Sequence, residues 1–185
     1  LSFDQISHSF YCFLPLVSFT NQTNRDFMGL ETNEPLSYSY FMRNFDKFRF
    51  LLQNLIDTDE SKWNASHLEL SQVAMQLESM TQFQYAQSIK IIPDDSEEWK
   101  SPWELMDGRK LTEFESRILS LYEKLFYHFT NNDIDLANNY ATLIIDEINS
   151  KKNINKSLLP LETFYNDIDI FLYSIVFYIL SFFLV

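Results

Sequence analysis

The chain has 185 residues, which is enough for one sizeable domain or two small ones with a buried core. Hydrophobic residues make up 46% and charged residues 22%, a composition typical of a globular protein and not of a disordered one. Acidic residues outnumber basic ones by 26 to 14, and the net charge of −12 excludes DNA and RNA as main partners, because their phosphates are repelled.

Glycine and cysteine are both scarce, and each scarcity excludes a class of site. With only 2 glycines, the chain lacks the glycine-rich phosphate loop of Rossmann and P-loop nucleotide-binding proteins. The single cysteine, Cys12, cannot form a disulfide within the chain. It also excludes a cysteine-based zinc site and the C-x-x-C-H haem-attachment motif.

Residues 1–34 give the weakest structural signal. The chain opens at Leu1 without a basic segment followed by an apolar one, so we expect a fragment or processed product with no signal peptide. The aromatic run 10–14 fits a strand, a buried loop or the end of a helix, and the polar residues 21–24 with Gly29 indicate a turn. We therefore leave residues 1–34 irregular or unassigned.

From Pro35 onward the sequence predicts helices, which together make residues 35–160 a helical soluble domain. Proline is well tolerated in the first turn of a helix. Apolar residues then recur at three- and four-residue steps, as on one helical face: Phe41, Phe45, Phe48, Leu52 and Leu55. We interpret this stripe as core and not as a cofactor site.

A second helix is predicted from Ser66 to about Ser88. Ser66 and Glu69 match the S-x-x-E capping box that opens many helices. The apolar face of this helix consists of Leu70, Val73, Leu77 and Met80. An extended apolar segment, 89–93, and an acidic loop, 94–100, follow it.

The clearest local signal is the segment Ser-Pro-Trp-Glu at 101–104. Serine is a good N-cap, proline fits the first helical position, and a glutamate at the third can reach back to the cap. The helix is expected to stop at Asp107-Gly108. Because Trp99 and Trp103 flank the cap four residues apart, we expect both to clamp the loop against the helical hairpin that follows, which makes the segment a structural joint and not an active site.

A helical hairpin follows. Thr112 and Glu115 form another capping box, and residues 131–133 (Asn-Asn-Asp) form a polar turn between two amphipathic stretches. The hairpin resembles one tetratricopeptide-type unit, without a second copy. Its apolar faces comprise Phe114, Ile118, Leu121, Tyr122, Leu125 and Phe129, then Ile134, Ala137, Tyr140, Ile144 and Ile148.

The end of the chain predicts a membrane segment. Residues 170–185 are 16 consecutive residues without a charge and without a polar stripe, where a spanning helix needs about 20. We interpret 161–185 as the lead into a transmembrane helix and its truncated start. A buried C-terminal core helix is the alternative. The flanking lysines 151, 152 and 156 do not fix the orientation.

No catalytic, cofactor-binding or metal-binding residue can be assigned from the pattern. His8, His67 and His128 lack a histidine or cysteine partner at metal-ligand spacing, and His128 is expected in a packed or rim position. The carboxylates in 94–98 lack the alternating ligands and central glycine of an EF-hand, so we expect a solvated loop.

Three segments in order resemble the fused System II cytochrome c biogenesis proteins, of the ResB–ResC or CcsB–CcsA type, especially those of Bacteroidetes-like bacteria. The segments are IKIIP at 89–93, WKSP at 99–102 and LETFYN at 161–166, the last leading directly into the apolar run. The resemblance covers roughly residues 66–185 and does not include residues 1–65.

The resemblance implies a protein of the bacterial inner membrane, with residues before about 166 on the periplasmic side. The family is similar to a haem exporter and cytochrome c synthase, so haem is implied for the full-length protein. Its membrane histidines and tryptophan-rich loop have no counterpart here, and no haem ligand is carried over. The implied partners are the rest of the same protein, the membrane and apocytochrome c.

We therefore expect a mainly α-helical, extracytoplasmic domain that has a structural or partner-positioning role in cytochrome c biogenesis. The alternative is a generic membrane-anchored helical interaction domain, which would bind a peptide or a partner helix at its hairpin. A stand-alone enzyme is the weakest interpretation, because no constellation of residues supports it.

Overall fold

The structure is a computed structural model that describes residues 3–84, 87, 89–93, 98–106 and 110–151. Contacts divide the chain into two units, Leu1–Ser150 and Lys151–Val185. The described part is mainly helical, which confirms the predicted fold class at that level. Within it, no helix combines the length and apolar character that crossing a bilayer requires. The predicted membrane segment, 161–185, lies outside the described residues.

The first 34 residues are more regular than we expected. They form helix α1 (Phe3–Phe10), the 3-10 helix η1 (Tyr11–Phe13) and helix α2 (Gln22–Met28). The Asn21 side chain caps α2 by accepting from the Thr23 N–H, and Gly29 ends it at a φ of 76°. Helices of eight and seven residues are too short to show a clear apolar period.

The helix predicted from Pro35 is two helices, α3 (Tyr38–Arg43) and α4 (Phe45–Asp57). Helix α3 begins after Ser37, whose hydroxyl accepts from the Tyr40 N–H at 3.0 Å. Asn44 interrupts the run, and its side chain donates to the Tyr40 carbonyl at 2.9 Å.

Because the helix is broken at Asn44, part of the predicted core is wrong. Phe41 and Phe48 are buried as expected, but Phe45 is 39% exposed. The expected stripe assumes one continuous helical period, which the break does not preserve. Phe41 and Phe48 contact each other edge to face, with centroids 5.0 Å apart, at the centre of the core.

Helix α5 (Ala65–Met80) follows the short 3-10 helix η2 (Glu60–Lys62), and it does not start as predicted. Its cap is Asn64: the Asn64 side chain accepts from the His67 N–H at 3.1 Å, and His67 Nδ1 accepts from the Asn64 N–H at 3.2 Å. The helix ends at Met80, before the 3-10 helix η3 (Thr81–Phe83). Its four predicted core residues are all buried.

Ser66 and Glu69 have a different role from the predicted one: they hold α2 against α5. Glu69 Oε1 accepts from the Thr20 and Asn21 N–H groups at 2.6 and 2.9 Å, and Oε2 accepts from the Asn24 amide at 2.8 Å. The Ser66 hydroxyl donates to Asn24 Oδ1 at 2.6 Å. Asn24 is thereby satisfied although it is 1% exposed.

The segment that follows contains a two-stranded antiparallel ladder, β1 (Ile92–Pro93) with β2 (Trp99–Lys100). Helix α6 (Pro102–Leu105) comes next and confirms the predicted cap. Ser101 Oγ accepts from the Glu104 N–H at 3.2 Å, and the Glu104 carboxylate accepts from the Ser101 N–H at 2.6 Å. Asp107-Gly108 lies outside the described residues.

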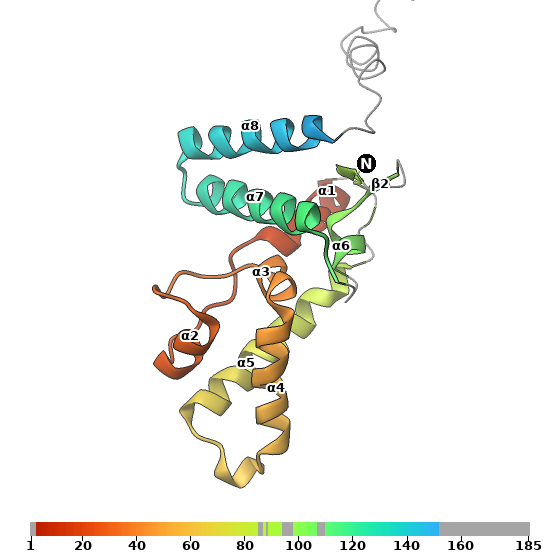
Figure 1. The fold of residues 1–185 in the computed structure, drawn as a ribbon. Helices are drawn as coiled ribbons and strands as arrows, with labels where there is room; N and C mark the ends of the chain where they lie inside the picture. The colour runs from red at the N-terminus through yellow and green to blue at the C-terminus, as the bar shows by residue number, and fades with distance from the viewer. Residues whose placement is uncertain (1–2, 85–86, 88, 94–97, 107–109, 152–185) are drawn as a thin grey trace, which may run out of the picture. The chain divides into compact units, whose positions relative to one another are not determined.

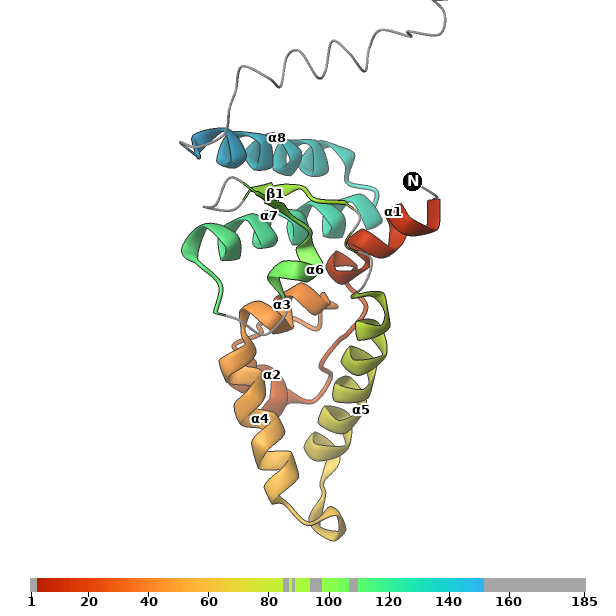
Figure 2. The same ribbon diagram turned by 90° about the vertical axis from the view of Figure 1, so that its right-hand side faces the viewer.

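The predicted hairpin is confirmed as α7 (Glu113–Thr130) and α8 (Ile134–Ser150), which lie side by side in Figures 1 and 2. The predicted capping box of Thr112 with Glu115 opens α7, and Asn132 takes a φ of 59° in the turn. Phe129 and Ile134 are exposed, although both belong to the expected apolar faces.

Trp103 joins three parts of the fold. It is 3% exposed, its Nε1 donates to the His8 carbonyl in α1 at 3.0 Å, and its ring centroid lies 5.2 Å from that of Tyr38 in α3. Trp99 is 36% exposed, so the expected clamp of two tryptophans is wrong for Trp99. The reason is that Trp99 lies on the small β-ladder and not on the helix.

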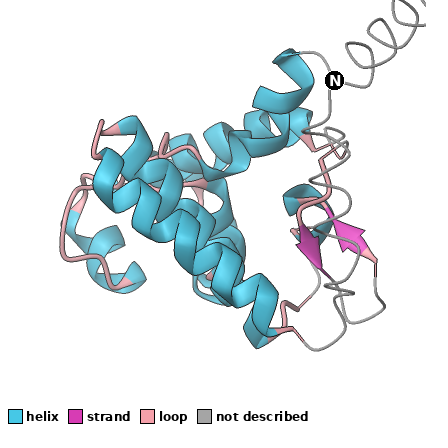
Figure 3. Ribbon diagram, turned by 90° about the horizontal axis from the view of Figure 1, so that it is seen from above, coloured by secondary structure: helices cyan, strands magenta, loops and turns pink. Residues whose placement is uncertain are grey.

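We call the contact of α1, α3 and α6 around Trp103 the Trp103 joint. Two pairs of helices flank it. Helices α4 and α5 form one pair and α7 and α8 the other, with α3 and α6 between them in both side views (Figures 1 and 2). Seen from above, the two strands lie beside the helices (Figure 3). The buried core continues from one helix pair to the other through Phe41, Trp103, Leu105, Ile118 and Leu119.

The joint predicts unequal effects of tryptophan truncation. Trp103→Ala should lower the free energy of unfolding by about 3–5 kcal/mol, because a large buried side chain and its hydrogen bond are lost. Trp99→Ala should cost about 1 kcal/mol or less, and Ser101→Ala about 1 kcal/mol for the lost cap. Urea denaturation measures all three, and equal costs for the two tryptophans would contradict the assignment.

The contact between α2 and α5 predicts a pH-dependent stability. Partial burial alone would raise the pKa of Glu69, but its hydrogen bonds from Thr20, Asn24 and Asn21 outweigh that effect, so the pKa lies below the ordinary 4.5. The ionised form therefore stabilises the fold above pH 4.5, and this contribution is lost as the pH falls through the lowered pKa.

Glu69→Gln should therefore cost about 1 kcal/mol at pH 7, and the cost should shrink below pH 4.5. Glu78→Gln is the matched control, since Glu78 is an exposed carboxylate on the same helix. Denaturation curves at pH 7 and in the acid range make the comparison. If the loss of unfolding free energy caused by Glu69→Gln grew as the pH fell, the assigned lowering of the Glu69 pKa would be wrong.

Candidate functional site

A groove lies between the end of η1, the loop before α3 and the second half of α7. One part of it has a volume of about 310 Å³ and is lined mainly by aromatic and proline side chains. A second hollow, of about 330 Å³, shares Pro15, Pro35 and Tyr127 with the first. We call the two together the tyrosine groove. Its further lining includes Phe13, Glu34, Tyr40, Glu123, Lys124, His128 and Tyr140.

Two loop segments form one wall because their backbones pair. Val17 and Leu36 make an isolated antiparallel bridge, and the N–H groups of Leu16 and Val17 donate to the Leu36 carbonyl at 3.1 and 3.0 Å. Pro15 and Pro35 lie just outside this bridge, where their missing N–H groups cost no ladder bond. Their rings give this wall a rigid apolar surface.

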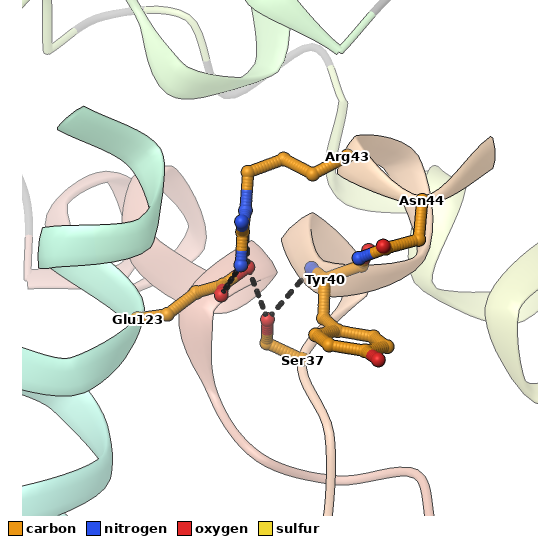
Figure 4. A network of polar contacts seen from close by, with 5 residues as sticks. All are labelled: Ser37, Tyr40, Arg43, Asn44 and Glu123. Carbon is orange, nitrogen blue, oxygen red and sulfur yellow. Dashed lines mark hydrogen bonds and ion pairs between the residues drawn. The ribbon is translucent and has the colours of Figure 1, made fainter. Parts of the chain in front are cut away.

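The opposite wall is fixed to α3 by a polar network, which Figure 4 shows. Arg43 forms an ion pair with Glu123 of α7, and both side chains are largely buried. The Ser37 hydroxyl donates to the same carboxylate at 3.0 Å, and it also accepts from the Tyr40 N–H. Ser37 therefore caps α3 and joins it to α7 at the same time.

Two tyrosines of the groove, Tyr40 and Tyr127, have pKa values raised above the ordinary one. Burial raises the pKa of Tyr40, and Arg43 only partly offsets it. Burial also raises the pKa of Tyr127, and the nearby carboxylate of Glu34 raises it further. Both hydroxyls therefore keep their protons at neutral pH. The Tyr127 hydroxyl already bonds to the Glu34 carboxylate, whereas the Tyr40 hydroxyl can donate to a ligand.

His128 lies at the end of the groove near the hairpin turn, in the packed rim position that was predicted. Its Nδ1 is 3.5 Å from Asp133 Oδ2, and its ring stacks on Tyr140 with centroids 5.3 Å apart. The ammonium group of Lys124 lies 5.6 Å from the centroid of the Tyr140 ring. The His128 and Lys124 side chains therefore already have partners within the protein.

The other two histidines and Cys12 lie apart from His128. His8 lies in α1 with its ring 4.7 Å from that of Phe83, and His67 closes the cap of α5. Burial raises the pKa of the Cys12 thiol well above its usual value, which makes it unreactive. Within the described ranges, no three histidine, cysteine or carboxylate side chains gather as a metal site would require. Residues 94–97 lie outside those ranges.

The groove is suited to binding. Its walls are aromatic and proline rings, and its two buried polar groups, Ser37 and Glu123, are used in joining α3 to α7. Glu34 is exposed at the rim. Such a surface offers flat apolar contacts, tyrosine donors and one carboxylate to a ligand.

The groove is not apparent from the sequence, because its walls come from segments that are far apart in the chain. Residues 13–15 and 34–37 belong to loops or to short elements, and only the α7 residues have a regular spacing. Two i, i+4 pairs put groove residues on neighbouring positions of α7: Glu123 with Tyr127, and Lys124 with His128. That spacing was the available signal, but it did not identify what faces it.

Comparison of the chain with known protein families, curated proteins and solved structures finds no match.

The network behind the groove predicts a strong coupling between α3 and α7. Arg43→Met and Glu123→Gln should each lower the free energy of unfolding by about 1–3 kcal/mol, because each leaves a largely buried partner unpaired. A double-mutant cycle should give a coupling of about 1 kcal/mol or more. The control is the exposed i, i+4 pair of Arg117 and Glu113, where about 0.3–0.5 kcal/mol is expected. Equal couplings in the two cycles would contradict the role of the buried pair.

Proposed function

We propose that this chain is the extracytoplasmic segment of a membrane cytochrome c biogenesis protein of the fused System II type. Its role there is to position the flanking membrane parts or the approaching apocytochrome. The proposal rests on the order of the segments 89–93, 99–102 and 161–166 in the sequence. It places the protein in a bacterial inner membrane, with residues before about 166 on the periplasmic side.

The observation that carries a positioning role is the joint at Trp103. The segment 99–102 is one of the three segments that carry the resemblance, and it leads into a capped helix whose tryptophan contacts both α1 and α3. A motif that connects three elements through buried contacts is suited to fixing their arrangement. This supports a structural role for the motif.

Haem chemistry is not assigned to this segment. A haem-binding histidine needs an imidazole nitrogen directed into a space that fits the flat macrocycle. His67 Nδ1 is used in the helix cap, and the His128 ring is stacked on Tyr140 with its Nδ1 near Asp133. We assign no haem-ligand role to these histidines and derive no step through haem from them.

The positioning role predicts that activity follows protein amount. In cells whose c-type cytochromes mature through the complete protein that carries this chain, Trp103→Ala should lower maturation only as far as it lowers abundance. Haem staining of cytochromes and immunoblotting of the protein measure the two quantities. Trp99→Ala is the control and should leave both near the wild-type level.

A Trp103→Ala protein that accumulated normally but matured no cytochrome would contradict the structural role. The joint would then belong to the path of haem or apocytochrome. Normal maturation in cells that lack the complete protein altogether would contradict the proposed function itself.

A second proposed function is that of a membrane-anchored helical interaction domain, and the tyrosine groove favours it. The groove offers an apolar surface with hydrogen-bond donors at a position that does not involve the Trp103 joint. The two proposals differ in what they expect after residue 185. Further membrane spans with histidines and a tryptophan-rich loop favour the synthase, and a short basic tail favours the single anchor.

A further inference from the structure

We propose that the tyrosine groove binds an extended, proline-containing peptide segment that carries a basic residue. This inference rests on the second proposed function, binding by a helical interaction domain, and names the partner. The first proposed function does not depend on it.

The shape of the groove favours an extended ligand. Its two hollows, of about 310 and 330 Å³, meet at Pro15, Pro35 and Tyr127. Two adjacent hollows separated by flat rings suit successive side chains of a polyproline II segment.

The polar groups of the groove match the same ligand. A polyproline II segment makes no internal hydrogen bonds, so its backbone carbonyls need external donors. Tyr40, Tyr127 and Tyr140 line the groove. The Tyr40 and Tyr140 hydroxyls are donors for such carbonyls, whereas the Tyr127 hydroxyl already bonds to Glu34. Proline-rich peptides bind aromatic-lined grooves in this way at low entropic cost, because the peptide is already extended.

Charge indicates a basic residue in the ligand. Glu34 is exposed at the rim beside Tyr127, whereas Glu123 is already paired with Arg43. Tyrosine rings of this groove already attract cations within the protein: the Arg43 guanidinium lies 6.0 Å from the Tyr40 centroid, and Lys124 lies over Tyr140. A lysine or arginine of the ligand would contact Tyr127 and Glu34, and the net charge of −12 would attract it over longer range.

The test is a titration of the purified full chain against a fluorescein-labelled, proline-rich peptide with one central lysine. Fluorescence anisotropy should show saturable binding. Tyr127→Ala should weaken it by about tenfold or more, as for a central aromatic contact. Glu34→Gln should weaken it about two- to fivefold, as for an exposed charge pair, and raised salt should do the same. Replacing the lysine of the peptide by norleucine should have the same effect as Glu34→Gln.

Two matched variants test whether the effect belongs to the groove. Phe129→Ala removes an exposed aromatic side chain from the same helix outside the groove lining, and Glu31→Gln removes one exposed carboxylate from the same loop. Both should bind as the wild type does, and circular dichroism should show the same helix content for all variants.

Three outcomes would overturn the proposal. Binding that Phe129→Ala or Glu31→Gln weakened as much as the groove variants would mean that the peptide binds by general attraction. Saturable binding of a helical amphipathic peptide with none of the extended peptide would keep the interaction function and reject this ligand class. Absence of binding by either peptide would reject the groove as a peptide site, while normal results in the cytochrome maturation assay would leave the first proposed function standing.

Discussion

The fold depends on the burial of Trp103 between the two pairs of helices. This side chain contacts Tyr38 of α3 and donates its indole N–H to the His8 carbonyl of α1, so one residue connects three elements that are far apart in the sequence. The capping box of Ser101 and Glu104 holds the backbone that carries it. Helix α6 has only four residues, too few to be stable alone, and it therefore owes its position to these contacts.

Much of the fold could be predicted from the sequence, because local signals decide local structure. The caps at Ser101 and Thr112, the hairpin turn and the core face of α5 all follow from patterns within a few residues. The Ser66 and Glu69 motif shows the limit of such patterns. Asn64 is an equally good cap two residues earlier, and Glu69 forms its bonds with a segment about 48 residues away. Only tertiary contacts distinguish the two arrangements.

The candidate site could not be predicted for the same reason. Arg43 and Glu123, whose ion pair joins α3 to α7 behind the groove, are 80 residues apart in the sequence. The wall that contains Pro15 and Pro35 depends on a single bridge between Val17 and Leu36. Each of these residues has an ordinary local interpretation, as a solvated charge or a turn proline. The i, i+4 spacing of Glu123 and Tyr127 puts both on one face of α7, but only the tertiary fold decides that this face meets α3.

The start of α3 connects the joint and the groove. Ser37 bonds to Glu123 behind the groove, and the next residue, Tyr38, packs against Trp103. A side chain that enters the groove beside Tyr40 therefore contacts the same short helix that the joint holds in place. The proposed ligand of the groove would thus contact the helix that also packs against Trp103, so the two proposals are compatible with each other.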